Sequence, residues 1–243
     1  DAVLADDNFA SIFAAVEEGR VVYDNIKKVT LFLISCGFGE LVAIIATLLM
    51  GFPIPYIAAQ ILWLNLVTNG LQDVALAFEP AEKGVLRRPP RSPKEGILTN
   101  LMIRRTFLMG FIMAAGTVLI FIVNLNSGVP LEQARTVALT TMVFFQFYQA
   151  LNCRSETLSI FKMNPMANPF LFLSMIAAFF AHLAVLYVPA LQWVFRTVPL
   201  TAKEWVSIGA ITITIVIAVE IDKWIRRERN VTKSKRTFDI TIS

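Results

Sequence analysis

Two apolar segments of the sequence carry side chains that could bind a cation. Residues 29–50 contain a single acidic residue, Glu40, near the middle of the segment. Residues 57–78 contain oxygen-bearing side chains at spacings of three and four, which share one face of a helix. These side chains are Asn65, Thr68, Asn69, Gln72 and Asp73. Carboxylate, amide and hydroxyl oxygens are the ligands that hard cations prefer, so the two segments predict a site for a dehydrated metal ion or a proton.

Both motifs also allow a purely structural interpretation. Gly37 and Gly39 could loosen the helix around Glu40 and expose carbonyl groups, or they could only let two helices approach closely. The polar row could only join neighbouring helices by hydrogen bonds, at about 0.6 kcal/mol each in a bilayer. A charged side chain at mid-bilayer costs about 3 kcal/mol on insertion scales and usually marks a function. Glu40 and Asp73 therefore favour the cation site.

The composition places both segments in a membrane. The chain has 243 residues, of which 56% are hydrophobic and 16% charged, and its mean hydropathy is +0.63. Soluble domains carry about 25% charged residues, whereas a helix needs about 20 apolar residues to cross a bilayer. We therefore expect an all-α membrane protein. The net charge of +4 comes from basic residues between the apolar runs, which indicates membrane topology and no nucleic-acid partner.

Six apolar runs predict a six-helix transmembrane bundle. They cover residues 29–50, 57–78, 103–125, 136–152, 169–188 and 204–225. The fourth run is diluted by Gln146 and Gln149, which could serve either helix packing or the site. Gly70 interrupts the polar turn of the second run, so local unwinding is expected there.

Polar residues in the last two runs are expected to be structural. A lone histidine in an apolar helix, here His182, is more often a hydrogen-bonded residue than a ligand. Glu220 and Asp222 lie near the end of the last run, where they could anchor it by pairing with Lys223 or Arg226.

The basic residues predict the orientation. If the N-terminus is cytoplasmic, all but three of the 22 lysines and arginines fall in cytoplasmic segments; the exceptions are Arg135, Arg196 and Lys203. This asymmetry follows the positive-inside rule. Both termini are therefore expected in the cytoplasm of a multi-pass membrane protein, and the loops favour a bacterial cell membrane.

Several motifs resemble those of P-type ATPases. The segments are residues 7–9, 15–20, 23–28, 39–40, 62–71, 88–95 and 146–152. The first three resemble the end of the phosphorylation domain and the stalk. The others resemble, in chain order, the fifth and sixth transmembrane helices, the loop after the sixth, and the eighth helix of calcium-pump-like cation transporters. Since the motifs agree in order and spacing, the chain is similar to the fifth to tenth helices of such a pump.

The resemblance implies a set of cation ligands. The residues at ligand positions are Glu40, Asn65, Thr68, Asn69 and Gln146. The chain departs from calcium pumps where Gly37 replaces an asparagine, Asn69 replaces an aspartate and Gln146 replaces a glutamate. Asp73 adds a carboxylate one turn further along, where those pumps carry a small uncharged residue.

The carboxylate count bears on the transported ion. Glu40 and Asp73 cannot neutralise two calcium ions in a low-dielectric site, so one divalent ion, or one or two monovalent ions or protons, fits better. We expect an ATP-driven cation pump that is calcium-type by resemblance, with a sodium, potassium or proton pump as the alternative. A secondary transporter or channel would show repeats between its two halves, and the sequence contains none that we recognise.

The resemblance also divides the chain. Residues 1–28 would be the end of the phosphorylation domain, with a short strand at residues 2–5 and the stalk helix, residues 29–225 the transport region, and residues 226–243 a basic cytoplasmic tail. The chain is expected to be a fragment that lacks the phosphorylated aspartate. ATP and Mg²⁺ would then act only through upstream actuator, nucleotide-binding and phosphorylation domains, and the partners would be those domains and membrane lipid.

Overall fold

The computed structural model describes residues 9–242 apart from positions 83, 88, 91–95 and 157, and only the backbone of residues 229–242. These residues form helices and connections, with no strand among them. The strand predicted at residues 2–5 and part of the loop at residues 88–95 lie outside the described residues.

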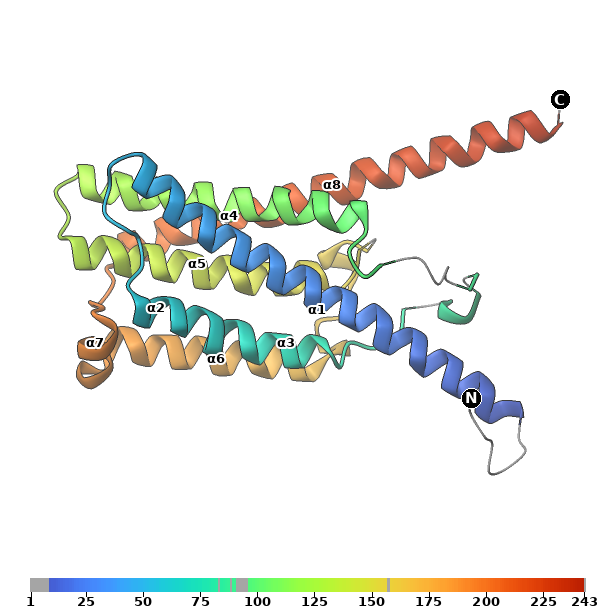
Figure 1. Cartoon of the computed structure of the whole chain (residues 1–243), viewed down its shortest axis with the longest axis horizontal. Helices are drawn as coiled ribbons and strands as arrows, with labels where there is room; N and C mark the ends of the chain where they lie inside the picture. Colours follow the sequence, from blue (N-terminus) through green and yellow to red (C-terminus); the bar gives the residue numbers. More distant parts are fainter. Residues whose placement is uncertain (1–8, 83, 88, 91–95, 157, 243) are drawn as a thin grey trace.

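Six rods run side by side along the long axis of the molecule (Figure 1). Five contain one long helix each: α1 (Phe9–Leu49), α4 (Asn100–Asn126), α5 (Leu131–Cys153), α6 (Pro169–Tyr187) and α8 (Ala202–Ile242). The remaining rod is built from three short pieces: α2 (Ala58–Trp63), the π-helix η1 (Leu64–Asn69) and α3 (Gly70–Leu76). Each rod corresponds to one of the six predicted runs, and α7 (Pro189–Phe195) adds a short turn between α6 and α8.

The predicted stalk and first span form one continuous helix. α1 is 41 residues long and projects from the end of the bundle that also holds the α3–α4 and α5–α6 connections (Figure 1); we call this the stalk end. α8 projects from the same end. A helix of this length spans about 60 Å, so α1 can carry a displacement from outside the bundle into its middle.

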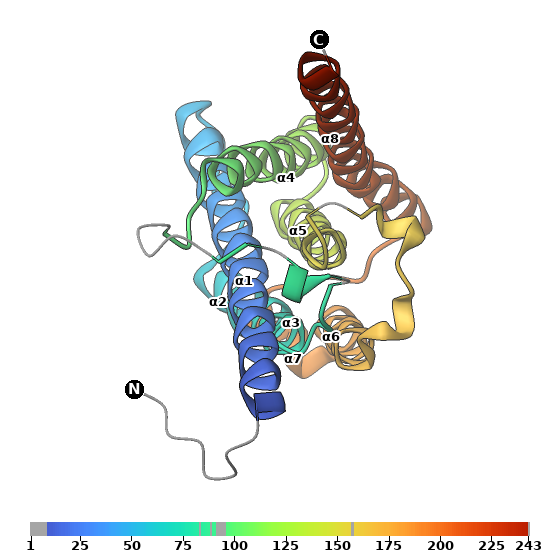
Figure 2. The same ribbon diagram turned by 90° about the vertical axis from the view of Figure 1, so that its right-hand side faces the viewer.

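By length and composition, four of the described helices could cross a membrane: Phe9–Leu49, Asn100–Asn126, Pro169–Tyr187 and Ala202–Glu228. The other two rods fall short for physical reasons. The second is divided by its π turn, and α5 is rich in polar residues that are buried against protein. Figure 2 shows α5 near the middle of the bundle, surrounded by the other rods. Because neighbouring helices shield α5 from lipid, it does not need an apolar surface all round.

Close contact between α1 and α4 depends on two glycines. A Cβ on Gly39 would lie 3.1 Å from Met113 Cβ and 3.3 Å from the Gly110 carbonyl oxygen. The ring of Phe38 fits beside Gly110 and makes edge-to-face contacts with Phe107 and Phe111. The helix is not interrupted here, so of the two interpretations given for these glycines the structure favours close packing at Gly39 and shows no loosening at Gly37.

Substitution of Gly110 tests this packing. Gly110→Leu is expected to destabilise the protein by about 1–3 kcal/mol, as overpacking does, because its Cβ would lie 2.4 Å from Phe38 Cδ1. Gly209→Leu in α8 is the matched control, since nothing lies within 4 Å of a Cβ there. Thermal unfolding of the full-length protein in detergent should show a lower midpoint for Gly110→Leu only; equal midpoints would contradict the packing.

Candidate cation site

A π turn positions the polar residues of the second rod. η1 covers Leu64–Asn69 and ends immediately before Gly70, where the sequence predicts unwinding. Two side chains in this turn bond to backbone one turn earlier: Asn65 Nδ2 donates to Ile61 O at 3.0 Å, and Thr68 Oγ1 lies 2.7 Å from Leu64 O. Isolated π turns inside helices are frequent at functional sites. Here the wider turn places Asn65 in contact with Glu40 of α1 and Thr68 in contact with Gln146 of α5.

Glu40 lies where α1, η1 and α5 meet. It is 4% exposed, and each carboxylate oxygen accepts one hydrogen bond from an amide. Gln146 Nε2 donates to Oε1 at 2.8 Å, and Asn65 Nδ2 donates to Oε2 at 3.1 Å. Thr68 Oγ1 is hydrogen-bonded to Gln146 Oε1, which links the fourth side chain to the set. The structure therefore brings together four of the six predicted site residues.

The other two predicted residues lie further along the same rod. Asn69 is 1% exposed, and neither of its side-chain polar atoms has a hydrogen-bond partner among the described residues. Asp73 is half-buried, and its Oδ1 atom also lacks a partner within the described part of the chain. Asn69 could thus supply an oxygen without breaking a hydrogen bond, whereas Asp73 is not hydrogen-bonded to Glu40.

The side chains that could ligate a cation at this site carry oxygen atoms and no sulfur or imidazole nitrogen. Within the described ranges, no three His, Cys, Asp or Glu side chains are grouped closely enough to hold a metal ion. The Glu40 set instead combines one carboxylate with two amides and a hydroxyl. Such neutral and singly charged oxygen ligands suit hard cations such as calcium or sodium better than soft transition metals.

Comparison with known proteins decides the family. Residues 53–225 match the family described as "Cation transporting ATPase, C-terminus". The chain belongs to this family. Over 229 residues it is 38% identical to the "Probable cation-transporting ATPase F" of Mycobacterium tuberculosis, an alignment that covers 94% of this chain and 25% of the relative.

Other relatives of this family carry calcium in their names. The "Calcium-transporting ATPase" of Bacillus subtilis is 38% identical over 207 residues, which are 85% of this chain and 23% of the relative. The human "Calcium-transporting ATPase type 2C member 1" is 35% identical over 229 residues, which are 94% of this chain and 25% of the relative. The chain thus spans about a quarter of the length of these curated relatives. Its family and its apolar helices show that it is an integral membrane protein.

Two further polar residues join neighbouring helices. Gln149, one turn from Gln146 on α5, donates to Ser35 Oγ on α1 at 2.9 Å. His182 Nε2 lies 3.0 Å from Thr140 Oγ1, which joins α6 to α5. His182 thus has the hydrogen-bonded position that the sequence indicated.

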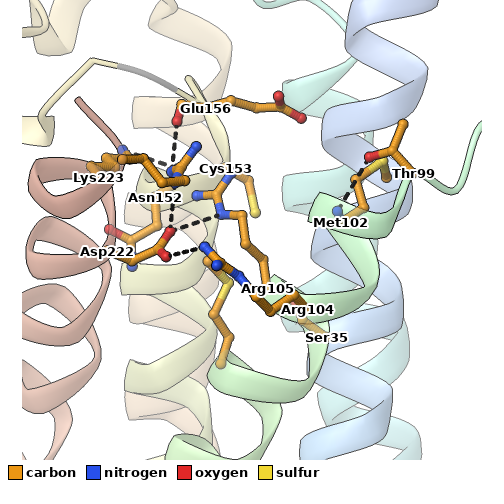
Figure 3. Close-up of polar contacts among 12 residues, drawn as sticks. Ser35, Thr99, Met102, Arg104, Arg105, Asn152, Cys153, Glu156, Asp222 and Lys223 are labelled. Carbon is orange, nitrogen blue, oxygen red and sulfur yellow. Dashed lines mark hydrogen bonds and ion pairs between the residues drawn. The ribbon is translucent and has the colours of Figure 1, made fainter. Parts of the chain in front are cut away.

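A second polar cluster lies between α4, α5 and α8 at the stalk end (Figure 3). Asp222 pairs with Arg104 at 2.7 Å and with Arg226 at 2.9 Å, and its Oδ2 lies 4.0 Å from Nε of the buried Arg105. The predicted pairing of Asp222 with Arg226 is therefore confirmed. Figure 3 shows Arg104 and Arg105 of α4 pointing toward Asp222 of α8, so the cluster anchors α8 to α4.

The prediction for Lys223 and Glu220 is wrong. Lys223 Nζ donates to Leu158 O at 2.8 Å instead of pairing with a carboxylate. Glu220 Oε1 accepts a hydrogen bond from Ile160 N at 2.9 Å. Both side chains reach the α5–α6 connection and form hydrogen bonds with its backbone groups in place of the predicted ion pairs.

Sequence reasoning also missed a buried ion pair at the stalk end. Arg154 Nε lies 2.9 Å from Glu79 Oε1, and both side chains are almost fully buried. Glu79 follows the end of an apolar run, where a charged residue usually lies in water, so its type and position gave no signal. Only the position of its partner, 75 residues away, reveals the pair.

Proposed function

We propose that this chain is the transport region of an ATP-driven cation pump and contributes half of its intramembrane cation site. The proposed ligands are Glu40, Asn65, Thr68, Asn69, Asp73 and Gln146. The observation that carries the proposal is the buried Glu40 carboxylate at the junction of three helices, with polar side chains on both of its oxygens. A carboxylate in this position is costly in a membrane unless positive charge compensates it.

The hydrogen bonds suggest how these side chains would exchange partners for an ion. Two amide NH₂ groups now supply partial positive charge to Glu40. Rotation of each amide about its last bond would replace the NH₂ group by an oxygen, so the same side chains could ligate a cation bound to the carboxylate. Asn69 and Asp73 would extend the oxygen set along the rod. The amides would thus stabilise the Glu40 carboxylate when no ion is bound and ligate the ion when it is bound.

ATP would act through parts of the protein outside this chain. In this proposal, upstream actuator, nucleotide-binding and phosphorylation domains use ATP and Mg²⁺, and phosphorylation displaces α1. Because α1 is continuous from Phe9 to Leu49, a displacement at its start reaches Glu40. Both chain ends would lie on the cytoplasmic side, consistent with α1 and α8 projecting from the same end (Figure 1). The membrane would be a bacterial cell membrane.

The ion is proposed to be calcium, with a monovalent cation or proton as the second candidate. The names of two relatives favour calcium. The hydrogen-bonded set contains a single carboxylate, which favours a smaller total charge of bound cations than two calcium ions carry. We therefore propose that the site holds one divalent ion.

Cation-stimulated ATP hydrolysis by the full-length protein in lipid vesicles tests this function. We expect micromolar to millimolar calcium to stimulate hydrolysis, because the site offers hard oxygen ligands. Stimulation by sodium, potassium or acid, without any effect of calcium, would support the second candidate. Hydrolysis that responds to none of these ions, or transport without ATP, would contradict the proposed pump function.

A further inference from the structure

The stalk end of α3 is attached to neighbouring helices, and the side chain of Glu79 makes several of these contacts. Its side chain follows α3 at the stalk end and is 6% exposed. Arg154 Nε, at the end of α5, lies 2.9 Å from Oε1, and Asn168 Nδ2, at the start of α6, donates to Oε2 at 2.8 Å. Both oxygens of this carboxylate are thus used to join α3 to the α5–α6 connection.

The backbone of the same turn is bound to α1. Asn25 Nδ2 lies 3.0 Å from Ala77 O and 2.8 Å from Glu79 O, and Asn25 is itself 4% exposed. Lys28 Nζ donates to Asn25 Oδ1 at 3.2 Å, which fixes the amide with its nitrogen toward α3. The last carbonyl groups of a helix lack partners within the helix. Here Asn25, a side chain of α1, supplies a partner for the Ala77 carbonyl group at the end of α3.

Asn168 completes the attachment on the other side. Besides Glu79, its Nδ2 donates to Ala75 O at 2.9 Å, and its Oδ1 caps α6 by accepting from Leu171 N at 3.0 Å. α3 is therefore held from α1 through its backbone and from α5 and α6 through the Glu79 carboxylate. Only nine residues separate Glu79 from Asn69, the last residue of the π turn that also carries Asn65 and Thr68.

We propose that Glu79 is a positioning residue that holds the end of α3 against α5 and α6. When α1 moves, the rod formed by α2, η1 and α3 then stays in place, and the π turn changes its position relative to Glu40 of α1. This inference rests on the proposed pump function and deepens it. A rod that followed α1 as a rigid body would keep Asn65 and Glu40 together. A rod fixed at Glu79 must change the distance between them, and with it the affinity for the cation.

Four variants of the full-length protein in lipid vesicles test this role. Glu79→Gln and Arg154→Gln each remove one charge of the pair, Asn25→Ala removes the link to α1, and Asp222→Asn is the control. Asp222 is also a carboxylate paired with arginine at the stalk end, but its partners lie on α4 and α8. Two quantities are measured: phosphorylation by inorganic phosphate without cation, and the calcium concentration that suppresses it by half.

We expect Glu79→Gln, Arg154→Gln and Asn25→Ala each to raise that calcium concentration about 3- to 30-fold, the range of coupling between distant sites. The level of phosphorylation without calcium should stay near that of the unmodified protein, which shows that the protein is folded. The double variant Glu79→Gln/Arg154→Gln should be no worse than either single one, because the two residues act as one unit. Asp222→Asn should leave both quantities unchanged.

Glu40→Gln in the same assay separates this inference from the proposed function. If calcium suppresses phosphorylation in the unmodified protein but not in Glu40→Gln, the pump function stands. Should Glu79→Gln and Asn25→Ala then behave like Asp222→Asn, the positioning role is wrong. If Glu40→Gln responds to calcium normally, the cation site itself is wrong. If Glu79→Gln is too unstable to measure, Arg154→Gln, which removes the other charge of the same ion pair, decides the outcome.

Discussion

Replacing Glu40 by alanine is expected to lower the affinity of the full-length protein for its cation by at least about 100-fold. Glu40 is the one carboxylate in the hydrogen-bonded set at the junction of α1, η1 and α5. Its loss removes the only full negative charge of that set and one hydrogen-bond acceptor from each of two amides. A 100-fold change corresponds to about 2.8 kcal/mol, at about 1.4 kcal/mol per tenfold change, which is modest for a charged ligand in a low-dielectric site.

The measurement is equilibrium binding of radioactive calcium to the purified protein. Glu220→Gln is the matched control for the isosteric variant Glu40→Gln, since it makes the same chemical change in the same bundle. Glu220 accepts a backbone hydrogen bond near the stalk end and is not connected to the site. We expect normal binding by Glu220→Gln and greatly weakened binding by both Glu40 variants. Normal binding by Glu40→Ala would contradict the assignment of Glu40 as a ligand.

Replacing Gln146 by glutamate is expected to favour divalent over monovalent cations by about tenfold or more. Gln146 Nε2 is 2.8 Å from Glu40 Oε1. A carboxylate in its place puts two negative charges in contact, and two unit charges 4 Å apart interact by about 4 kcal/mol at an effective dielectric constant of about 20. A divalent ion between them relieves this repulsion twice as strongly as a monovalent ion. Without a cation, the variant should also unfold at a lower temperature.

Gln133→Glu serves as the matched control for this gain of charge. Gln133 Nε2 donates to Glu204 Oε1 at 2.7 Å, so the substitution again sets a carboxylate beside a glutamate. The two residues belong to the first turns of α5 and α8, which begin at the end of the bundle opposite the stalk end (Figure 1), and Glu204 is only partly buried. Competition between calcium and sodium for the stimulation of ATP hydrolysis should change in Gln146→Glu and not in Gln133→Glu. If the competition changes equally in both variants, or changes in neither, the assignment of Gln146 to the site is wrong.

The sequence predicts the rods of this bundle well because they follow from apolar length. The predicted run at residues 169–188 and the observed helix Pro169–Tyr187 nearly coincide. α4, α5 and α8 extend beyond their predicted runs, because polar and charged residues at helix ends do not appear in a hydropathy pattern. The continuous course of α1 through Gly37 and Gly39 was not predicted. Contact with α4 stabilises the helix there, and local propensity does not include that contact.

Part of the candidate site could be predicted from periodicity, and part could not. A shared helix face places Asn65 and Thr68 together, and a carboxylate in a neighbouring run is a natural partner for them. The roles of the amides as donors to Glu40 depend on side-chain orientation, which a pattern does not contain. The π turn depends on hydrogen bonds with a period of five residues that no residue type specifies. Glu79 was missed because its partners are 75 and 89 residues away.

The most direct test of the cation site is an X-ray structure of the full-length protein grown with calcium, with anomalous differences recorded where calcium scatters anomalously. We predict an anomalous peak about 2.3–2.6 Å from a Glu40 carboxylate oxygen, the usual calcium–oxygen distance, with the side-chain oxygens of Asn65 and Gln146 turned toward it. A peak elsewhere in the membrane region, with both amides still donating to Glu40, would contradict the account.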